Sequence, residues 1–431
     1  MKTDQIYRIF REESKGVSTD TRTLNKGEIF FALSGDNYNG NKFAAEAVGK
    51  GALYAVIDDP AYETDKTVLV DDSLNELQAL AAFHRKELKI PVLAITGTNG
   101  KTTTKNLIAA VLAGKYKVHA TPGNLNNAIG VPLTILMAPE STEIMILEMG
   151  ANHIGEIRSL CLIARPDYGI ITNVGHAHLE GFGSLEGVLK AKSELYEHLG
   201  KVNGIAIFNE KDNMLTEKIL NLVNRTVPYS NPCGFKLEIQ GLPSDSNLCL
   251  QAVYKQNTYN LKTNLFGRFN LDNVRAAIAT GLFFGVAMPD IVEAIAEYRP
   301  ENNRSQLKST GLNTLVCDAY NANPASMKLA IESFASLKAV PKMLILGDML
   351  ELGDKSEEEH LGILKVISGY KFDNVLLAGQ IFSKLSSGFG ITSFPDTVAL
   401  AAYLDRENIK GYHILIKGSR GMKLEQIYKL L

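Results

Sequence analysis

Tryptophan is absent from this sequence of 431 residues, and cysteines and long apolar runs are scarce. No apolar stretch approaches the roughly 20 residues that a membrane-spanning helix needs, and the first residues carry no apolar segment of a signal peptide. The four cysteines are Cys161, Cys233, Cys249 and Cys317. Because none of them shows a Cys-x-x-Cys spacing, we expect free thiols without a metal or redox role. These absences favour a cytoplasmic protein with no membrane span.

An excess of charge of one sign is also missing. The formal net charge is -2 at pH 7, and no block of Lys and Arg of the kind that follows a nucleic-acid backbone is found. We therefore expect no nucleic-acid partner. A chain of this length is too long for one hydrophobic core. Since a domain typically has about 100 to 200 residues, we predict roughly three domains.

One phosphate-binding pattern stands out, at Thr96-Gly97-Thr98-Asn99-Gly100-Lys101-Thr102-Thr103. It follows an apolar strand-like run, 92–95, and leads into a helix with apolar residues on one face over 107–112. The glycines free backbone N–H groups to face phosphate oxygens, Lys101 supplies a cation, and the Thr102 hydroxyl can hold Mg²⁺. The loop lacks the upstream glycine of the general pattern, so an ordinary glycine-rich turn is the alternative.

Polar residues end the strands that follow. Glu148 ends an apolar run at 144–147, Asn173 follows one at 168–171, and Asn209 ends one at 205–208. Strands that alternate with helices form a parallel sheet, whose chemistry lies beyond the carboxyl ends of the strands. We expect these side chains to face the Lys101 loop, with Glu148 on Mg²⁺. For Glu148 the alternative is a cap on the next helix.

Other polar residues carry weaker signals. His176 and His178 follow a strand at the mouth of the predicted cleft. They either bind metal or substrate there, or are ordinary surface or core side chains. Lys192 is by default a solvated helix residue. Ser18, Asp20 and Arg22 favour a turn whose side chains bond its own backbone over a ligand site.

Two later regions complete the chain. Segment 213–265 has short alternating stretches, which predict a β-rich excursion on the central domain, and a helix follows with Asn270 and Asn273 on one face. An amide there can bond a base edge or simply cap the helix. From 306 onward strand-like runs restart, the first ending at Asp318. They predict a second parallel sheet that shares a cleft with the phosphate loop.

The fold class is therefore α/β with three domains. We predict a small N-terminal α/β domain at 1–90, a central P-loop domain with a parallel sheet at 91–305, and a C-terminal Rossmann-like α/β domain at 306–431.

The phosphate loop at 96–103 resembles the signature loop of the Mur ligases, the ATP-dependent amino-acid ligases of peptidoglycan synthesis. The resemblance runs almost end to end. Further matching blocks lie at 148–157, 177–184, 318–327 and 346–353. The last two, Asp-Ala-Tyr-Asn-Ala-Asn-Pro-Ala-Ser-Met and Leu-Gly-Asp-Met-Leu-Glu-Leu-Gly, are similar to the branch that adds D-alanyl-D-alanine. The chain departs from the family at Asn39-Gly40-Asn41, where relatives often carry Asp-Gly-His.

The resemblance implies a reaction. A carboxylate of UDP-N-acetylmuramoyl-tripeptide attacks the γ-phosphate of ATP to give an acyl phosphate, and the amine of D-alanyl-D-alanine displaces phosphate, which yields the UDP-N-acetylmuramoyl-pentapeptide. This reaction fits the residues of the chain, because they can position phosphate groups and include no evident Ser-His or Cys-His nucleophile.

The resemblance also implies roles for residues. Lys101 and Thr102 hold the phosphates and a first Mg²⁺, which Glu148 also ligates. His178 joins a second Mg²⁺, and Lys192 becomes carbamylated by CO₂, which makes it a metal ligand. The nucleotide contacts are Gly97, Thr98, Asn99, Gly100, Lys101, Thr102, Thr103, Asn209, Asp212, Asn273, Arg304 and Asp318. The substrate contacts are Ser18, Asp20, Arg22, Asn124, Asn126, Asn127, Asn321, Asn323 and Ser326.

Three alternatives stay open at this point. One is the related branch that adds diaminopimelate or lysine as the third amino acid, which usually shows a Tyr-Ala-His-type block where this chain has Tyr320-Asn321-Ala322-Asn323. Another is a P-loop kinase or NTPase without ligation. The third is a binding module that nucleotide switches. We expect a monomer.

Overall fold

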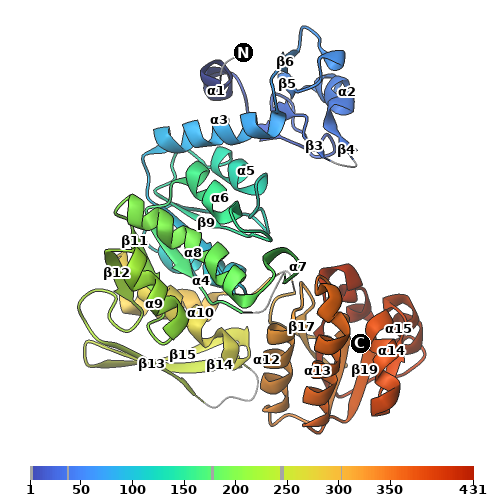
Figure 1. Cartoon of the computed structure of the whole chain (residues 1–431). Helices are drawn as coiled ribbons and strands as arrows, with labels where there is room; N and C mark the ends of the chain where they lie inside the picture. Colours follow the sequence, from blue (N-terminus) through green and yellow to red (C-terminus); the bar gives the residue numbers. More distant parts are fainter. Residues whose placement is uncertain (1–2, 36–37, 176–178, 243–246, 302) are drawn as a thin grey trace.

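The computed structural model describes residues 3–35, 38–175, 179–242, 247–301 and 303–431 (Figure 1). Its large sheets follow one another along the chain, with four strands, six strands and nine strands. Helices cover them, so the predicted α/β class is confirmed. The domain limits at 90 and 305 stay predictions. No helix in the described part of the chain is long and apolar enough to cross a membrane.

The N-terminal sheet is small and wholly parallel. Its strands, in spatial order, are β1 (Val17–Ser18), β2 (Ile29–Phe31), β5 (Tyr54–Ile57) and β6 (Thr67–Leu69). Helix α2 (Ala44–Gly49) lies between β2 and β5 along the chain. Asn41, in the segment that departs from the family, is 2% exposed, and its Nδ2 donates to Asp58 Oδ1 at 2.7 Å. This side chain holds the sheet's own loops together.

A long helix joins this sheet to the centre of the molecule. Helix α3 (Ser73–Leu88) begins where Asp72 accepts the backbone N–H of Asn75 at 2.7 Å. It packs against α1 (Thr3–Glu12) on one side and against α5 (Gly130–Leu136) and α6 (Glu156–Ala164) on the other (Figure 1). Buried Arg85 on α3 donates to the carbonyl oxygen of Ala164 at 2.8 Å, which fixes the helix to the end of α6.

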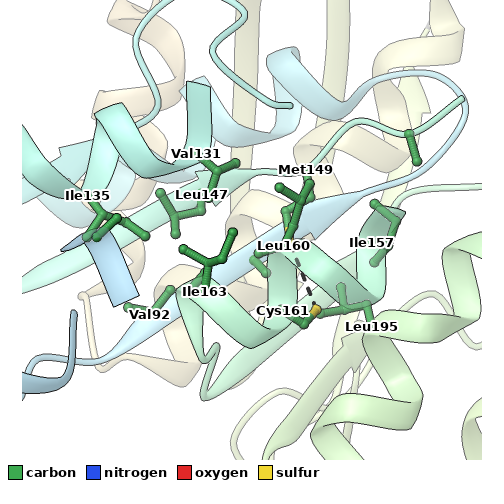
Figure 2. Packing of buried hydrophobic residues seen from close by; sticks show 14 of the residues in the cluster. Val92, Val131, Ile135, Leu147, Met149, Ile157, Leu160, Cys161, Ile163 and Leu195 are labelled. Carbon is green, nitrogen blue, oxygen red and sulfur yellow. Dashed lines mark hydrogen bonds between the residues drawn. The ribbon is translucent and has the colours of Figure 1, made fainter. Parts of the chain in front are cut away.

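The central sheet is parallel, as predicted. Its strands, in spatial order, are β12 (Arg225–Pro228), β11 (Ile205–Phe208), β10 (Tyr168–Ile171), β7 (Val92–Thr96), β9 (Ile144–Glu148) and β8 (Val118–Ala120). Strand β7 lies between β10 and β9, so the phosphate loop leaves the middle of the sheet. Figure 2 shows part of the apolar cluster beside β7 and β9, which includes Val92, Leu147 and Met149 together with Leu160 and Cys161 of α6. Each of the four described cysteines is a free thiol, as predicted.

Segment 213–265 corrects one prediction, because it is not β-rich throughout. Residues Asn213–Leu222 form helix α9, which Asp212 caps by accepting the backbone N–H of Leu215 at 3.1 Å. Leu215 and Ile219 lie four residues apart and are buried, a helical spacing that the alternating pattern nearby obscured. The rest of the segment is β-rich, as predicted: strands β13 (Leu237–Leu242), β14 (Asn247–Tyr254) and β15 (Asn257–Phe266) pair antiparallel.

The C-terminal sheet is parallel over five strands. In spatial order they are β17 (Thr314–Asp318), β21 (His413–Lys417), β18 (Lys342–Gly347), β19 (Asn374–Ala378) and β20 (Thr392–Phe394). Strand β16 (Gln306–Ser309) pairs antiparallel with β17 and joins this sheet to β15. The carboxyl ends of β17 and β21 face the phosphate loop, and this brings the two parallel sheets to one cleft.

Candidate functional site

The phosphate loop runs between β7 and helix α4 (Lys101–Ala113), as predicted. Gly97 and Gly100 have positive φ angles of 140° and 80°, which an L side chain adopts only with strain. A Cβ on Gly97 would lie 2.0 Å from Thr172 Oγ1, and one on Gly100 would lie 2.4 Å from Asn273 Oδ1. The loop therefore needs both glycines to keep its shape.

The Lys101 side chain folds back over its own loop. Its Nζ donates to the carbonyl oxygens of Gly97 at 2.7 Å and Thr98 at 3.0 Å. Burial lowers the pKa of Lys101, while Glu148 acts in the opposite sense. This places one ammonium group at the N-terminus of α4, where an anion is favoured.

Asn173 holds the loop from the neighbouring strand, as its place at a strand end predicted. Its Oδ1 accepts the backbone N–H of Asn99 at 3.0 Å, and its Nδ2 donates to the Asn99 carbonyl oxygen at 3.0 Å. The Asn99 side chain points across the cleft, where its Oδ1 accepts Nδ2 of Asn323 at 2.8 Å. The phosphate loop thus contacts the C-terminal sheet's loops directly.

Two buried oxygens near the loop are suited to a cation. Thr102 Oγ1 and Glu148 Oε2 have no hydrogen-bond partner, although the residues are only 5% and 1% exposed. A buried oxygen without a hydrogen bond is costly, and a hard divalent cation with oxygen ligands relieves that cost. The donor set therefore fits Mg²⁺. Groups of three or more His, Cys, Asp or Glu that could hold a metal are not found in the described ranges.

The loop at Thr121–Ala128 lies beside Glu148. Asn126 Nδ2 donates to Glu148 Oε1 at 2.8 Å, and the Glu148 N–H donates to Thr121 Oγ1 at 2.9 Å. Asn124, Asn126 and Asn127 all line the cleft, and the substrate contact that the resemblance implied for them stays a prediction. Glu148 therefore contacts this loop and does not cap the following helix.

Lys192 contradicts its default prediction of a solvated helix residue. It lies on α8 (Leu185–Lys201), is 2% exposed, and donates from Nζ to the Ala151 carbonyl oxygen at 3.4 Å. Burial, followed by the nearby Lys101 ammonium, lowers the pKa of Lys192 to about 7, against the smaller opposite effect of Glu156 and Glu194. The sequence spacing could not reveal this burial, because α8 has buried residues on more than one face.

His176 and His178 lie outside the described residues, so the predicted second metal ligand is not placed.

The C-terminal side of the cleft is built from the ends of β17 and β21. Lys417 Nζ donates to Asp318 Oδ2 at 2.7 Å, and Asp318 Oδ1 accepts the N–H of Ser305 at 2.9 Å. The guanidinium carbon of Arg304 lies 3.6 Å from the centre of the Tyr320 ring, and Arg304 Nε has no partner. Arg304, Asp318 and Lys417 therefore line one wall, where the sequence had not singled out Lys417.

Asn323 and Ser326 line the cleft but also serve a local structural purpose. Asn323 Oδ1 accepts the Ser326 N–H at 2.8 Å, and Ser326 Oγ accepts the Asn323 N–H at 3.1 Å, which forms a capping box on α12 (Pro324–Ala335). Asn321 Oδ1 accepts the N–H of Ala322 at 2.9 Å. The side-chain oxygens of Asn321, Asn323 and Ser326 are thus engaged within this turn, while Asn323 Nδ2 contacts Asn99 across the cleft.

Asn270 and Asn273 lie side by side, as their three-residue spacing predicted, and Asn273 lies close to the phosphate loop at Gly100. Asn273 Oδ1 accepts Thr104 Oγ1–H at 3.1 Å, and Asn273 Nδ2 donates to Asn270 Oδ1 at 2.8 Å. Asn209 and Asp212 also line the cleft, while Asp212 caps α9. Asn209 therefore lies at the cleft-facing edge, as its place at a strand end predicted, and the nucleotide contacts of Asn209, Asp212 and Asn273 stay predictions.

The Ser18, Asp20 and Arg22 turn is confirmed as a turn. The Asp20 N–H donates to Ser18 Oγ at 3.3 Å, and the Arg22 N–H donates to Asp20 Oδ1 at 2.9 Å. The Arg22 guanidinium beside Asp20 lowers the pKa of that carboxyl to about 2. These residues do not line the cleft, and a ligand role for them stays a prediction.

The phosphate loop and the loops around it line one open cavity of about 1380 Å³, whose lining does not include Lys192. Its lining includes Leu74 and Gln78 of α3, the phosphate loop, the loop at 124–129 and the C-terminal turn at 320–326. Typical small-molecule pockets measure roughly 300 to 1000 Å³, so this cavity has room for more than one ligand.

Sequence comparison defines the class of protein. The Mur ligase middle domain matches residues 95–281, and the Mur ligase, glutamate ligase domain matches residues 303–420. The chain belongs to the Mur ligase family.

Two relatives that share one name are similar to nearly the whole chain. The chain is 38% identical over 429 residues to the UDP-N-acetylmuramoyl-tripeptide–D-alanyl-D-alanine ligase of Bacillus subtilis (strain 168), covering 96% of this chain and 92% of the relative. It is 33% identical over 431 residues to the enzyme of that name from Escherichia coli (strain K12), covering 96% and 93%.

Solved structures agree in overall fold. A crystal structure of MurF from Acinetobacter baumannii has a TM-score of 0.85 at 28% identity, with 98% of this chain and 97% of that chain covered. MurF ligase from Thermotoga maritima in complex with ADP has a TM-score of 0.83 at 26% identity, with 97% of each chain covered.

Proposed function

We propose that this chain is an ATP-dependent ligase that joins D-alanyl-D-alanine to UDP-N-acetylmuramoyl-tripeptide in the cytoplasm. One observation carries the proposal. The phosphate loop, the C-terminal turn at 320–326, and Thr102 and Glu148, each with a buried oxygen that has no hydrogen-bond partner, line the same cavity. The full-length similarity to ligases of that name supports the choice of substrates.

The residues divide the work of the reaction between them. Backbone N–H groups of the phosphate loop and Lys101 bind the terminal phosphates of ATP, and Thr102 with Glu148 would hold Mg²⁺, which supplies positive charge to the phosphoryl group. The Asn124 to Asn127 loop positions the donor carboxylate. That carboxylate attacks the γ-phosphorus and ADP leaves. The dipeptide amine then attacks the acyl carbon, and phosphate and a proton leave.

A panel of donors and acceptors tests this function. Purified protein receives ATP and Mg²⁺ with either the UDP-muramoyl dipeptide or tripeptide, and with D-alanyl-D-alanine, diaminopimelate or lysine. We expect a new peptide product, identified by its mass, only from tripeptide with D-alanyl-D-alanine. A product from dipeptide with diaminopimelate or lysine would support the third-residue branch, and ADP formation without any product would support a kinase or NTPase.

We further propose that Lys192 carries a carbamate. A neutral amine is the form that attacks CO₂: an N–C bond forms, one proton is released and the side chain becomes anionic. Because the pKa of Lys192 is lowered to about 7, the neutral fraction rises as the pH rises through 7 and dominates above it. The resulting carboxylate is a hard oxygen ligand suited to Mg²⁺.

Lys192→Ala should lower turnover by about 100-fold, because an anion that orients a metal is lost, and added acetate or formate should restore part of it. The measurement is the initial rate of ligation with and without the short carboxylates. The exposed Lys190 on the same helix provides the control, since Lys190→Ala should neither lose activity nor respond to them. Absence of rescue, together with absence of a carbamate signal from ¹³C-labelled bicarbonate in the NMR spectrum of the intact enzyme, would refute carbamylation.

A further inference from the structure

Lys105 is a buried cation that the residues assigned above leave unexplained. It lies one helical turn after Lys101 on α4 and is 2% exposed. It does not line the cavity. A lysine is almost never fully buried unless it is paired, so its surroundings call for a physical reason.

Lys105 donates to two carbonyl groups of the loop that positions the donor, and it also lies near the Glu148 carboxylate. Its Nζ donates to the carbonyl oxygens of Thr121 at 2.5 Å and Gly123 at 3.5 Å. The same Nζ lies 4.0 Å from Glu148 Oε2. The ammonium group therefore ties the phosphate-binding helix to the start of the Thr121–Ala128 loop.

Hydrogen bonds from two other segments hold the middle and the end of this loop. The Gly150 N–H donates to the Asn126 carbonyl oxygen at 2.7 Å, and Gln78 Nε2 on α3 donates to the Ala128 carbonyl oxygen at 3.0 Å. Thus α3 holds its end, the segment after β9 holds its middle and Lys105 holds its beginning. Of these contacts, the one from Lys105 joins the loop to the helix that begins with Lys101.

We propose that Lys105 is a positioning residue that fixes the Thr121–Ala128 loop, and with it the donor peptide, against the phosphate-binding helix. The inference rests on the proposed function, in which Asn124 to Asn127 position the donor carboxylate for attack on ATP. Because Lys105 acts through the loop, it governs binding of the UDP-linked donor more than binding of the nucleotide. A displacement of reacting groups by about 1 Å can cost roughly 100-fold in rate, so such a tie matters for an in-line attack.

The chain offers a control lysine just beyond the end of the same helix. Lys115 lies just after the end of α4, and its Nζ also donates to two consecutive loop carbonyl oxygens, those of Phe284 and Gly285, each at 3.0 Å. It is exposed and does not line the cavity. Lys115→Met therefore removes the same kind of contact at a place unrelated to the donor loop.

The test compares Lys105→Met and Lys115→Met in the full chain. Donor affinity is measured by calorimetry with UDP-N-acetylmuramoyl-tripeptide, and KM is measured for donor, ATP and Mg²⁺, with a thermal unfolding curve for each protein. We expect Lys105→Met to raise the donor Kd and KM by about 10-fold to 100-fold, which is the effect of removing residues that orient metal ligands. The ATP KM should change little. Lys115→Met should leave all of these constants unchanged.

Three results would overturn the proposal: equal losses for donor and ATP, a changed Mg²⁺ requirement with an unchanged donor KM, or wild-type constants in Lys105→Met. Should Lys105→Met fail to fold, Lys105→Arg takes its place, because its bulkier cation keeps the donors but shifts the loop, and the same split between donor and ATP is expected. If the wild-type protein itself neither binds the donor nor ligates, the proposed function fails and the role of Lys105 is a separate matter.

Discussion

Lys101→Ala should reduce turnover by about 1000-fold or more while leaving binding of the UDP-linked donor largely intact. The Lys101 ammonium stands at the N-terminus of α4 and is the cation placed by the phosphate loop itself, on the carbonyl oxygens of Gly97 and Thr98. In phosphoryl transfer most of the rate acceleration comes from positioned positive charge, and the loss of a single donor to developing charge costs about 100-fold to 1000-fold. The kcat of ligation and the donor Kd by calorimetry measure the two effects separately.

A control separates this loss from a loss of fold. Lys101 also satisfies two loop carbonyl groups, so the variant's unfolding midpoint is measured beside that of Lys115→Ala, which removes a lysine from the far end of α4. A variant that folds, binds the donor and still ligates at more than about a tenth of the wild-type rate would contradict the role of Lys101 in phosphoryl transfer.

Glu148→Gln should lower turnover by about 100-fold and raise the Mg²⁺ concentration needed for half-maximal rate. The substitution keeps the shape of the side chain and an oxygen that can accept Asn126 Nδ2, but it removes the negative charge whose second oxygen has no hydrogen-bond partner. Since Mg²⁺ binds carboxylates far better than amides, the cost should fall on the metal. A titration of initial rate against Mg²⁺ at saturating substrates measures it.

Glu143 provides the comparison for this prediction. It directly precedes β9, the strand that Glu148 ends, and it is exposed and accepts the backbone N–H of Lys117 at 2.7 Å. Glu143→Gln should leave the Mg²⁺ titration unchanged. If Glu148→Gln lowered the rate with an unaltered Mg²⁺ requirement, Glu148 would act on the Asn126 loop alone and not on a cation.

The phosphate loop and the strand-end residues could be predicted because their signals are local. Glycines, a lysine and a threonine in fixed order between an apolar strand and a helix determine the loop. Parallel strands then bring Glu148 and Asn173 to the same edge of the sheet, because the carboxyl ends of parallel strands coincide. The central and C-terminal parallel sheets could also be predicted from local signals, because each strand is a short apolar run and helices alternate with the strands.

The remaining features depend on contacts between distant parts of the chain. Lys192 was interpreted as a solvated helix lysine, and Lys105 was not singled out at all, because the burial of both arises from elements that no local pattern encodes. Lys417 reads as the end of a strand, although it pairs with Asp318, which lies 99 residues earlier. Helix α9 was missed because its two buried residues form too short a stripe to stand out from neighbouring strands.

The most direct measurement is a crystal structure of the protein with Mg²⁺ and a non-hydrolysable ATP analogue. We expect the terminal phosphates within hydrogen-bonding distance of Lys101 Nζ and the N–H of Gly100, and the cation in contact with Thr102 Oγ1 and Glu148 Oε2. A triphosphate bound elsewhere, with Lys101 still on the carbonyl oxygens of its own loop, would contradict the assignment of this loop as the site of phosphoryl transfer.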